Sequence, residues 1–389
     1  MESDIVIVGA GPAGLSLAAS LSGNGYAITL VERQSIDQLA DPPFDGREIA
    51  LTHRSVRILD ELSVWDALAD RDAVPLRQAQ VLNGRSSFVL GIEPRARIEG
   101  LLGWLVPNHC IRRELHRVVT ELPDVQILAG ADVANVRPDA ARVEVVLRDG
   151  RVLRPGLLVG ADSRMSSIRD MLGIGAKVHR TGRSMLVCRM EHERDHRRTA
   201  TEWFDYHQTL ALLPLAGRTS SAVITLPSHE VEELAALNEA AFETEVTRRF
   251  AGRMGRMRLA STRHLYPLTV TWSRRFVSGR AALVGDAAVG MHPVTAHGFN
   301  LGLLGQHGLA RELLRRSGRN RDLGSAGALV RYERLHRLAC RPIYEGTNAL
   351  VGLYTREGPV SRAARSILLR TAQRMPVVRR GVEALLAQR

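Results

Sequence analysis

The segment DIVIVGAGPAG, residues 4–14, decides the fold of this chain. Its first five residues are mostly apolar and β-branched, which is typical of a buried parallel strand. Residues 15–22 repeat apolar side chains at helical spacing, and residues 26–31 form a second apolar run that ends at Glu32. The strand, the glycine-rich turn, the helix and the second strand together predict a nucleotide-binding α/β unit.

The glycines of this turn have separate physical roles. Gly9 permits the tight turn, Gly11 lets the backbone approach a pyrophosphate, and Gly14 lets the helix pack closely against the strand. Phosphate is expected at the helix N-terminus, where N–H groups and the helix dipole favour anions. Glu32 is placed to accept a ribose hydroxyl, which fits NAD or the ADP half of FAD. The candidate cofactor-binding residues of this unit are Gly9, Gly11, Pro12, Ala13, Gly14, Glu32 and Arg33.

The composition excludes several classes of protein. With 45% hydrophobic and 24% charged residues among 389, the chain can bury a sizeable core and is not disordered, collagen-like or a coiled coil. Three cysteines without a CxxC pair exclude a disulfide scaffold and a thiolate zinc site, and they indicate a reducing compartment. We expect no bound metal. The sequence shows no basic secretory signal, and its longest uncharged stretch, residues 287–310, is rich in glycine. We therefore expect a cytoplasmic protein without a transmembrane span.

The net charge of +12 raises the question of a partner. Aromatic residues are only 4% and the arginines are spread along the chain, so we expect no nucleic acid partner. Residues 356–389 hold eight arginines against two glutamates, and their apolar side chains repeat at helical spacing. This segment fits a helix on an anionic membrane surface or a helix packed on the body of the protein, and the two are compatible.

A second group of motifs lies near residue 290. A predicted strand over residues 280–284 precedes a GDAA sequence, then a proline, then a Gly-x-Asn helix start, none of which NAD binding requires. These motifs resemble the GDAAH, proline and GQGxN pattern of flavoprotein monooxygenases with the para-hydroxybenzoate hydroxylase fold. The resemblance implies that Asp286 binds the FAD ribityl chain and that the helix N-terminus faces the flavin N1–C2=O edge. The FAD contacts that it implies here are Asp286, Pro293, Gly298, Phe299 and Asn300.

A middle motif agrees with this resemblance. Residues 157–169 look like the family's GADGxxSxxR segment, which implies that Asp162 contacts FAD and the passing pyridine nucleotide. The resemblance also implies a flavin-side contact for Arg47 and a contact with the flavin or its ribityl chain for Asn108. The chain departs from the family pattern at Ser163, at Val289 and at residues 296–298.

The motifs span the chain and imply interleaved domains. We expect an α/β fold in which a Rossmann-type FAD-binding domain alternates with an antiparallel-sheet substrate domain, followed by C-terminal helices. The FAD-binding segments are residues 1–74, 106–176 and 273–330, the substrate-sheet segments are 75–105 and 177–272, and the basic helical region is 331–389. Because FAD fills the one nucleotide site, NADH or NADPH is expected to bind transiently.

The sequences of residues 47–55, 210–215 and 292–303 look like those of ubiquinone-biosynthesis ring hydroxylases. This resemblance implies hydroxylation of a lipophilic phenol or quinol of the demethoxyubiquinol type, with NAD(P)H and O2, through a C4a-hydroperoxyflavin. Residues 209–215 are apolar on both faces of the predicted strand, which fits either a core strand or an apolar pocket. In the pocket interpretation the candidate substrate-binding residues are Leu212, Pro214 and Pro293.

His297 is the candidate catalytic residue, because it is the only titratable side chain in the expected flavin-facing helix start. We expect it to hydrogen-bond the phenol or relay its proton; the alternative is a histidine that only caps the helix or is satisfied by the backbone. Other functions stay open, namely hydroxylation of another aromatic metabolite, flavin-dependent prenyl reduction, and a non-catalytic FAD-bearing subunit. A lipophilic substrate is also compatible with peripheral attachment to the cytoplasmic membrane or with a ubiquinone-biosynthesis assembly.

Overall fold

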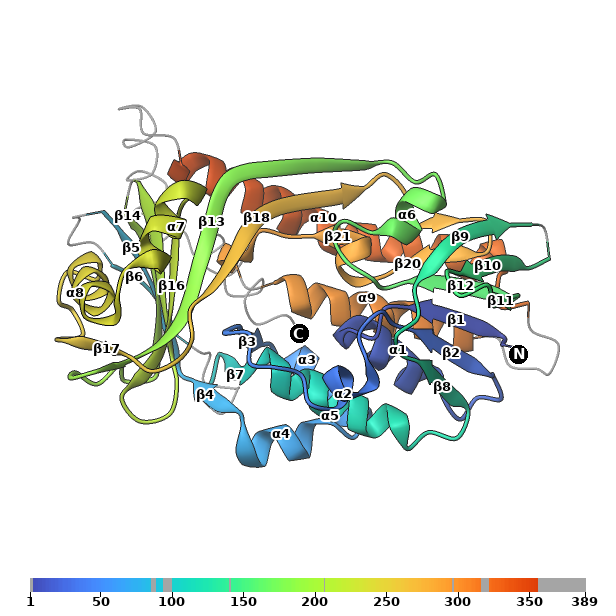
Figure 1. The fold of residues 1–389 in the computed structure, drawn as a ribbon, viewed down its shortest axis with the longest axis horizontal. Helices are drawn as coiled ribbons and strands as arrows, with labels where there is room; N and C mark the ends of the chain where they lie inside the picture. Colours follow the sequence, from blue (N-terminus) through green and yellow to red (C-terminus); the bar gives the residue numbers. More distant parts are fainter. Residues whose placement is uncertain are drawn as a thin grey trace.

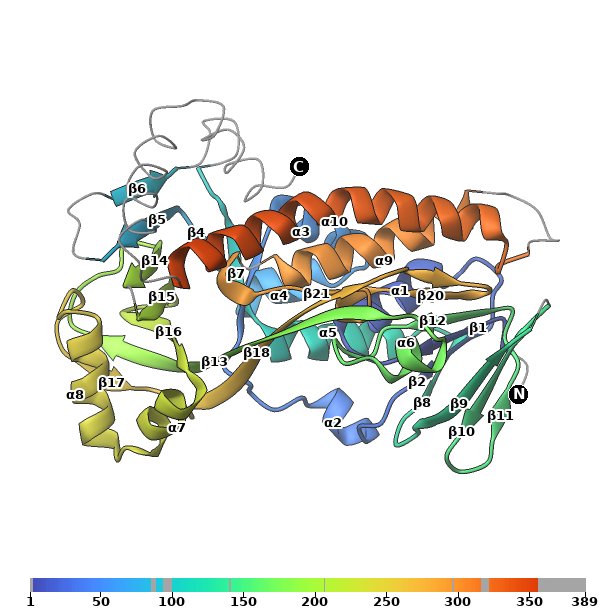
Figure 2. The same ribbon diagram turned by 90° about the horizontal axis from the view of Figure 1, so that it is seen from above.

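A computed structural model describes residues 3–84, 89–93, 100–139, 141–205, 207–295, 297–315 and 322–355. The basic segment 356–389 and position 296 of the predicted AHG motif lie outside these residues. Two large sheets, joined by long strands and flanked by helices, form most of the described part of the chain (Figures 1 and 2).

The first sheet has six strands in the order β19-β20-β12-β1-β2-β8. Five of them run parallel, and the short β19 is antiparallel to β20. The strands are β1 (Ile5–Val8), β2 (Ile28–Val31), β8 (Val125–Leu128), β12 (Leu157–Gly160), β19 (Val277–Ser278) and β20 (Ala281–Leu283). Every residue of β1, β2 and β12 is buried, as parallel strands covered on both faces require. The expected α/β class is therefore confirmed.

Helices cover this sheet. They are α1 (Pro12–Leu21), α5 (Asn108–Thr120), α9 (Gly298–Leu314) and α10 (Ala326–Thr355), and the short α6 (Ser167–Met171) follows β12. α1 packs against α5 and α9, and α10 lies along α9 (Figure 2). The buried hydroxyl of Tyr332 in α10 donates to the Leu283 carbonyl of β20 at 2.7 Å, which ties the long helix to the sheet edge. A separate three-stranded sheet comprises β9 (Val133–Pro138), β10 (Val143–Leu147) and β11 (Val152–Leu153).

The second large sheet has nine strands, with the order β21-β18-β13-β16-β15-β14-β5-β6 and β17 beside β13. Its strands are β5 (Gln78–Asn83), β6 (Val89–Ile92), β13 (Ala176–His192), β14 (Thr199–Asp205), β15 (Gln208–Pro214), β16 (Thr219–Pro227), β17 (Met257–Leu259), β18 (His264–Ser273) and β21 (Val289–Gly290). One face packs on α7 (Ser228–Ala236) and α8 (Glu239–Arg249) through a second hydrophobic core. β13 and β18 are long enough to reach from this core to the first sheet (Figure 1).

A small sheet lies between the two halves. It pairs β3 (Glu48–Leu51) and β4 (Val74–Leu76) with β7 (Gly103–Pro107), and it carries α2 (Ile36–Ala40), α3 (His53–Glu61) and α4 (Trp65–Arg71) nearby. Two short 3-10 turns, Gly285–Ala287 and Pro293–Thr295, lead from β20 into α9. Among the described residues, no helix is both long and apolar enough to cross a membrane.

Candidate active site

The glycine-rich turn after β1 has the geometry that phosphate binding requires. Gly9 has a φ of +107°, and a Cβ at this position would lie 2.5 Å from the carbonyl oxygen of Ala161. A Cβ on Gly11 would meet no atom within 4 Å, so open space lies beside it. α1 begins at Pro12 with Gly11 as its N-cap and without a side-chain cap, which leaves backbone N–H groups for an anion. These observations fit a pyrophosphate.

Glu32 lies at the end of β2 beside this turn. Its Oε2 accepts a hydrogen bond from the Ala10 amide at 2.8 Å, and its Oε1 accepts one from the Gln34 amide at 2.9 Å. The carboxylate is therefore held in one orientation and still has acceptor capacity for a ribose hydroxyl. Arg33, also predicted as a cofactor contact, is exposed.

The structure brings the three sequence motifs together. Gly9 of the first motif packs against the backbone of Ala161 in the second. Gly285 of the third has a φ of +60°, and a Cβ there would lie 2.9 Å from the Cβ of Ala13 in α1. Motifs that are more than 100 residues apart in the sequence thus meet around the start of α1.

Two aspartates lie where these motifs meet. Asp162 accepts from the Ile168 amide at 3.4 Å through Oδ2, whereas its buried Oδ1 has no hydrogen-bond partner among the residues that the structure describes. Asp286 accepts from Arg164, with Nη2 at 2.8 Å and Nε at 3.2 Å from the same carboxylate oxygen, Oδ2. Both carboxylates retain an acceptor that fits the hydroxyls of FAD. Sequence reasoning missed Arg164, whose only signal was its position directly after Asp162 and Ser163.

Asp45 connects the predicted contacts Arg47 and Asn108. Its Oδ2 accepts from Arg47 Nη2 at 2.6 Å and from Asn108 Nδ2 at 2.7 Å. Burial by itself would raise the pKa of Asp45, but the Arg47 guanidinium and the Asn108 amide outweigh burial and lower that pKa. The Tyr266 hydroxyl donates to the Asp45 carbonyl at 2.6 Å, so β18 of the second sheet reaches this cluster. Asp45 lay outside every motif and was not predicted.

The start of α9 contains the predicted residues His297, Gly298, Phe299 and Asn300. His297 is 4% exposed and precedes the helix, and its side chain makes no hydrogen bond that caps the helix. A Cβ on Gly298 would meet nothing within 4 Å, and Phe299 packs at the edge of the main core. The Asn300 side chain links α9 to α3 and β3: its Oδ1 accepts from Ser55 Oγ at 2.6 Å, and its Nδ2 donates to the Ala50 carbonyl at 2.9 Å.

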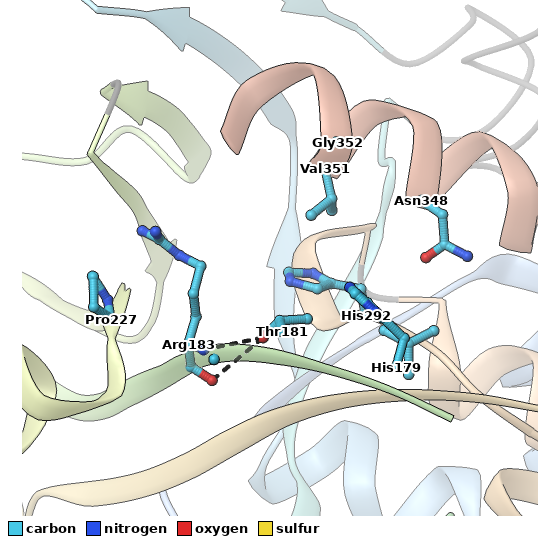
Figure 3. Close-up of a pocket in the computed structure, with 10 residues that line it drawn as sticks. His179, Thr181, Arg183, Pro227, His292, Asn348, Val351 and Gly352 are labelled. Atoms are coloured by element: carbon cyan, nitrogen blue, oxygen red, sulfur yellow. Dashed lines mark hydrogen bonds between the residues drawn. The ribbon is translucent and has the colours of Figure 1, made fainter. Parts of the chain in front are cut away.

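A cavity of about 550 Å³ lies between β13, the loop before α9 and the end of α10 (Figure 3). Its lining combines polar and apolar side chains. It includes Thr181 and Arg183 of β13, Pro227 of β16, Val270 of β18, His292 of the loop before α9, and Val351 of α10. The volume lies in the usual range of small-molecule sites. His292 directly precedes the predicted Pro293. The sequence therefore indicated this segment as part of the site, but it did not show that the His292 side chain points into the cavity.

Leu212 and Pro214, the predicted substrate contacts of β15, do not line this cavity. Leu212 is 6% exposed and belongs to the core beneath α7 and α8, and Pro214 is buried in the same strand. The opposite face is the one that meets the small sheet, because Arg189 Nη2 of β13 donates to Glu48 Oε1 of β3 at 2.7 Å. The structure therefore agrees with the core interpretation of Leu212, and no contact in it supports a substrate role for Leu212 or Pro214.

Comparisons with known proteins agree with this geometry. The model of the FAD binding domain family matches residues 2–324. Ubiquinone hydroxylase UbiM of Neisseria meningitidis is 42% identical over 98% of this chain and 83% of its own length. Ubiquinone hydroxylase UbiL of Rhodospirillum rubrum is 34% identical over 97% of this chain and 88% of its own length. 3-Demethoxyubiquinol 3-hydroxylase of Escherichia coli is 28% identical over 97% of this chain and 96% of its own length.

Solved structures show the same fold. p-Nitrophenol 4-monooxygenase PnpA of Pseudomonas putida superposes with a TM-score of 0.79 at 18% identity, covering 100% of this chain and 99% of that one. The resident cofactor is FAD, and NAD(P)H is the reductant typical of these enzymes. From its motifs, its fold and its relatives, this chain belongs to the FAD-binding domain family of FAD-dependent monooxygenases.

Proposed function

We propose that this protein hydroxylates the aromatic ring of a lipophilic phenol or quinol of ubiquinone biosynthesis, with NAD(P)H and O2 as co-substrates. The observation that carries the proposal is the 42% identity with ubiquinone hydroxylase UbiM, which extends over 98% of this chain. Two geometric observations support it: the three FAD motifs meet around the start of α1, and His292, on the segment between Asp286 and α9, lines a cavity of about 550 Å³.

The residues described above fit FAD along one path. We infer that the pyrophosphate lies at Gly11 and the start of α1, and that the adenosine ribose binds Glu32. Asp162 and Asp286 then bind hydroxyls near the ribityl chain, and the cluster of Arg47 and Asn108 lies on the flavin side. The N-terminus of α9 offers N–H groups and a positive dipole end to an electron-rich ring edge. When bound, FAD accepts electrons from NAD(P)H and activates O2 for transfer of one oxygen atom.

The cavity suits an uncharged ring better than a carboxylate. Arg183 is a cation in its wall, but its Nη2 already donates to the carbonyls of His207 and Thr225. A benzoate-type substrate needs a cation that is available for a bidentate pair. We infer that the ring of the substrate enters between β13 and α10, where the apolar Val270 and Val351 exclude water.

We further infer a division of labour between the sheets. The six-stranded sheet with residues 1–74, 106–176 and 273–330 binds FAD, and the nine-stranded sheet with residues 75–105 and 177–272 closes over the substrate. We also propose that the protein works in the cytoplasm and touches the membrane that holds its substrate. Exposed apolar side chains on α10 support this contact, with Val330 56%, Leu335 53% and Leu338 65% exposed.

The test measures O2 uptake by the purified, FAD-loaded protein with NADH or NADPH and 2-geranylphenol. The proposal expects a flavin absorbance spectrum and O2 uptake that rises when the phenol is added. NAD(P)H oxidation that the phenol stimulates without O2 would instead indicate a reductase. Bound FAD without any stimulated oxidation would indicate a non-catalytic subunit, and either result contradicts the hydroxylase.

A further inference from the structure

His292 presents a buried hydrogen-bonding group to the cavity. The residue is 7% exposed and lines the cavity wall together with Thr181 and Val351 (Figure 3). Its Nδ1 accepts a hydrogen bond from the Val294 amide at 3.3 Å. Its Nε2 has no hydrogen-bond partner among the residues that the structure describes. One ring nitrogen is thus used by the protein, and the other remains for a ligand.

The imidazole is neutral at physiological pH. Burial, followed by the charges of Arg183 and Arg164, lowers the pKa of His292 to about 4. Because Nδ1 accepts from a backbone amide, the single proton of the neutral ring is on Nε2. The cavity therefore contains an oriented N–H donor. A ligand that brings an oxygen atom into the cavity can accept this hydrogen bond.

The position of His292 in the chain couples the cavity to the cofactor motifs. His292 lies between Asp286 and the start of α9, on the segment that carries both. This segment is held in place at Gly290, whose amide donates to Thr271 Oγ1 at 3.1 Å. Arg164 binds Asp286, and its positive charge also helps to lower the pKa of His292. A ring oxygen at Nε2 is therefore fixed relative to the residues that fit FAD.

We propose that His292 donates its Nε2–H to the ring oxygen of the phenolic substrate, and so positions the ring and favours its phenolate character. This inference rests on the proposed function and adds to it the residue that recognises the phenol oxygen. No proton is transferred by His292 in this role. The electron density that it favours on the ring is what an aromatic carbon needs to accept an oxygen atom.

The test compares two ligands that differ only in the oxygen atom, 2-geranylphenol and geranylbenzene. Equilibrium dialysis with the FAD-loaded protein measures the Kd of each. The wild type is expected to bind the phenol about tenfold more tightly. His292→Phe and His292→Leu remove the donor and are expected to abolish this preference. His292→Gln retains an N–H donor and should restore part of it. His179→Phe alters an exposed histidine of the same cavity and should keep the full preference.

Each outcome separates the two levels of the proposal. A preference for the phenol that persists in His292→Phe and His292→Leu overturns the role of His292 and leaves the hydroxylase standing. A wild type that binds neither ligand and shows no phenol-stimulated O2 uptake removes both. Flavin absorbance checks the folding of each variant. Loss of FAD from both donor-less variants would assign His292 to the fold and would also overturn its role as a substrate contact.

Discussion

The Arg164 guanidinium binds a single carboxylate oxygen of Asp286, with Nη2 at 2.8 Å and Nε at 3.2 Å from Oδ2, although 122 residues separate the two in the sequence. Arg164 also donates to the Thr269 carbonyl of β18 at 3.1 Å. One side chain therefore connects the middle motif, the third motif and the second sheet. Neither of these hydrogen bonds uses Oδ1 of Asp286, the oxygen that we propose for the FAD contact.

We expect Arg164→Gln to weaken FAD binding. Without the guanidinium, Asp286 loses the contact that orients its carboxylate, and both groups are about one-third exposed, so the loss is modest. The Kd of FAD for the apoprotein should rise by about three- to tenfold, with a larger rise for Asp286→Ala. Flavin fluorescence during reconstitution measures both. Equal affinities in wild type and Arg164→Gln would show that Asp286 needs no partner.

Gly11→Val should separate cofactor binding from folding. A Cβ at Gly11 meets no protein atom within 4 Å, so we expect the apoprotein to unfold at nearly the same temperature as the wild type. The same side chain fills the space that fits the pyrophosphate, and FAD affinity should fall at least about tenfold. Gly308→Ala in α9 also enters open space and serves as the control that keeps its FAD. A Gly11→Val protein that retains FAD would move the pyrophosphate elsewhere.

The sequence predicted those features that depend on local pattern. A β-branched strand, a glycine-rich turn and a following helix specify their own geometry, and so Gly9, Gly11 and Glu32 lie where they were expected. Contacts that depend on the packing of distant segments were beyond the sequence. Asp45 is only two residues from Arg47, but its contact with Asn108 depends on the pairing of β3 with β7, which sets Glu48 opposite Pro107.

The side of a strand is a second property that the sequence did not determine. Residues 209–215 are apolar on both faces of the strand. The alternation of apolar and polar side chains that normally identifies the buried face is therefore missing, and it could not assign Leu212 to one face. The packing of α7 and α8 decided it, because these helices cover the face of Leu212. The direction of His292 likewise follows from the Val294 amide and the enclosure by α10, not from the HPV sequence.

We expect Asn300→Ala to destabilise the protein. Asn300 is 2% exposed and joins α9 to β3 and α3, with Thr52 N at 3.2 Å and Ser55 Oγ at 2.6 Å from its Oδ1. Removal leaves these buried groups without the acceptor, which costs about 1–3 kcal/mol in the free energy of unfolding. Chemical denaturation of the apoprotein measures this change. Asn24→Ala in an exposed turn is the control, with an expected change below about 0.5 kcal/mol; equal effects would contradict the role of Asn300.

Glu202 should make stability depend on pH. It lies on β14 opposite Ala211 and Val81, and burial raises its pKa to about 8. Between its ordinary value near 4.5 and 8, the folded protein holds a proton that the unfolded chain releases, so this group's contribution to stability falls as pH rises. Glu202→Gln should therefore raise the melting temperature at pH 8 and leave it nearly unchanged at pH 4. The exposed Glu233→Gln is the control; identical pH profiles for wild type and Glu202→Gln would refute the assignment.

The central claim is that this chain transfers one oxygen atom from O2 to the ring of a lipophilic phenol. The most direct measurement supplies isotopically labelled O2 to the FAD-loaded protein with NAD(P)H and 2-geranylphenol, and analyses the product by mass spectrometry. The account predicts a hydroxylated product that carries one labelled oxygen atom, and less of this product from Gly11→Val at the same FAD concentration. Recovery of unmodified phenol while NAD(P)H is consumed, or a product whose new oxygen is unlabelled, would contradict it.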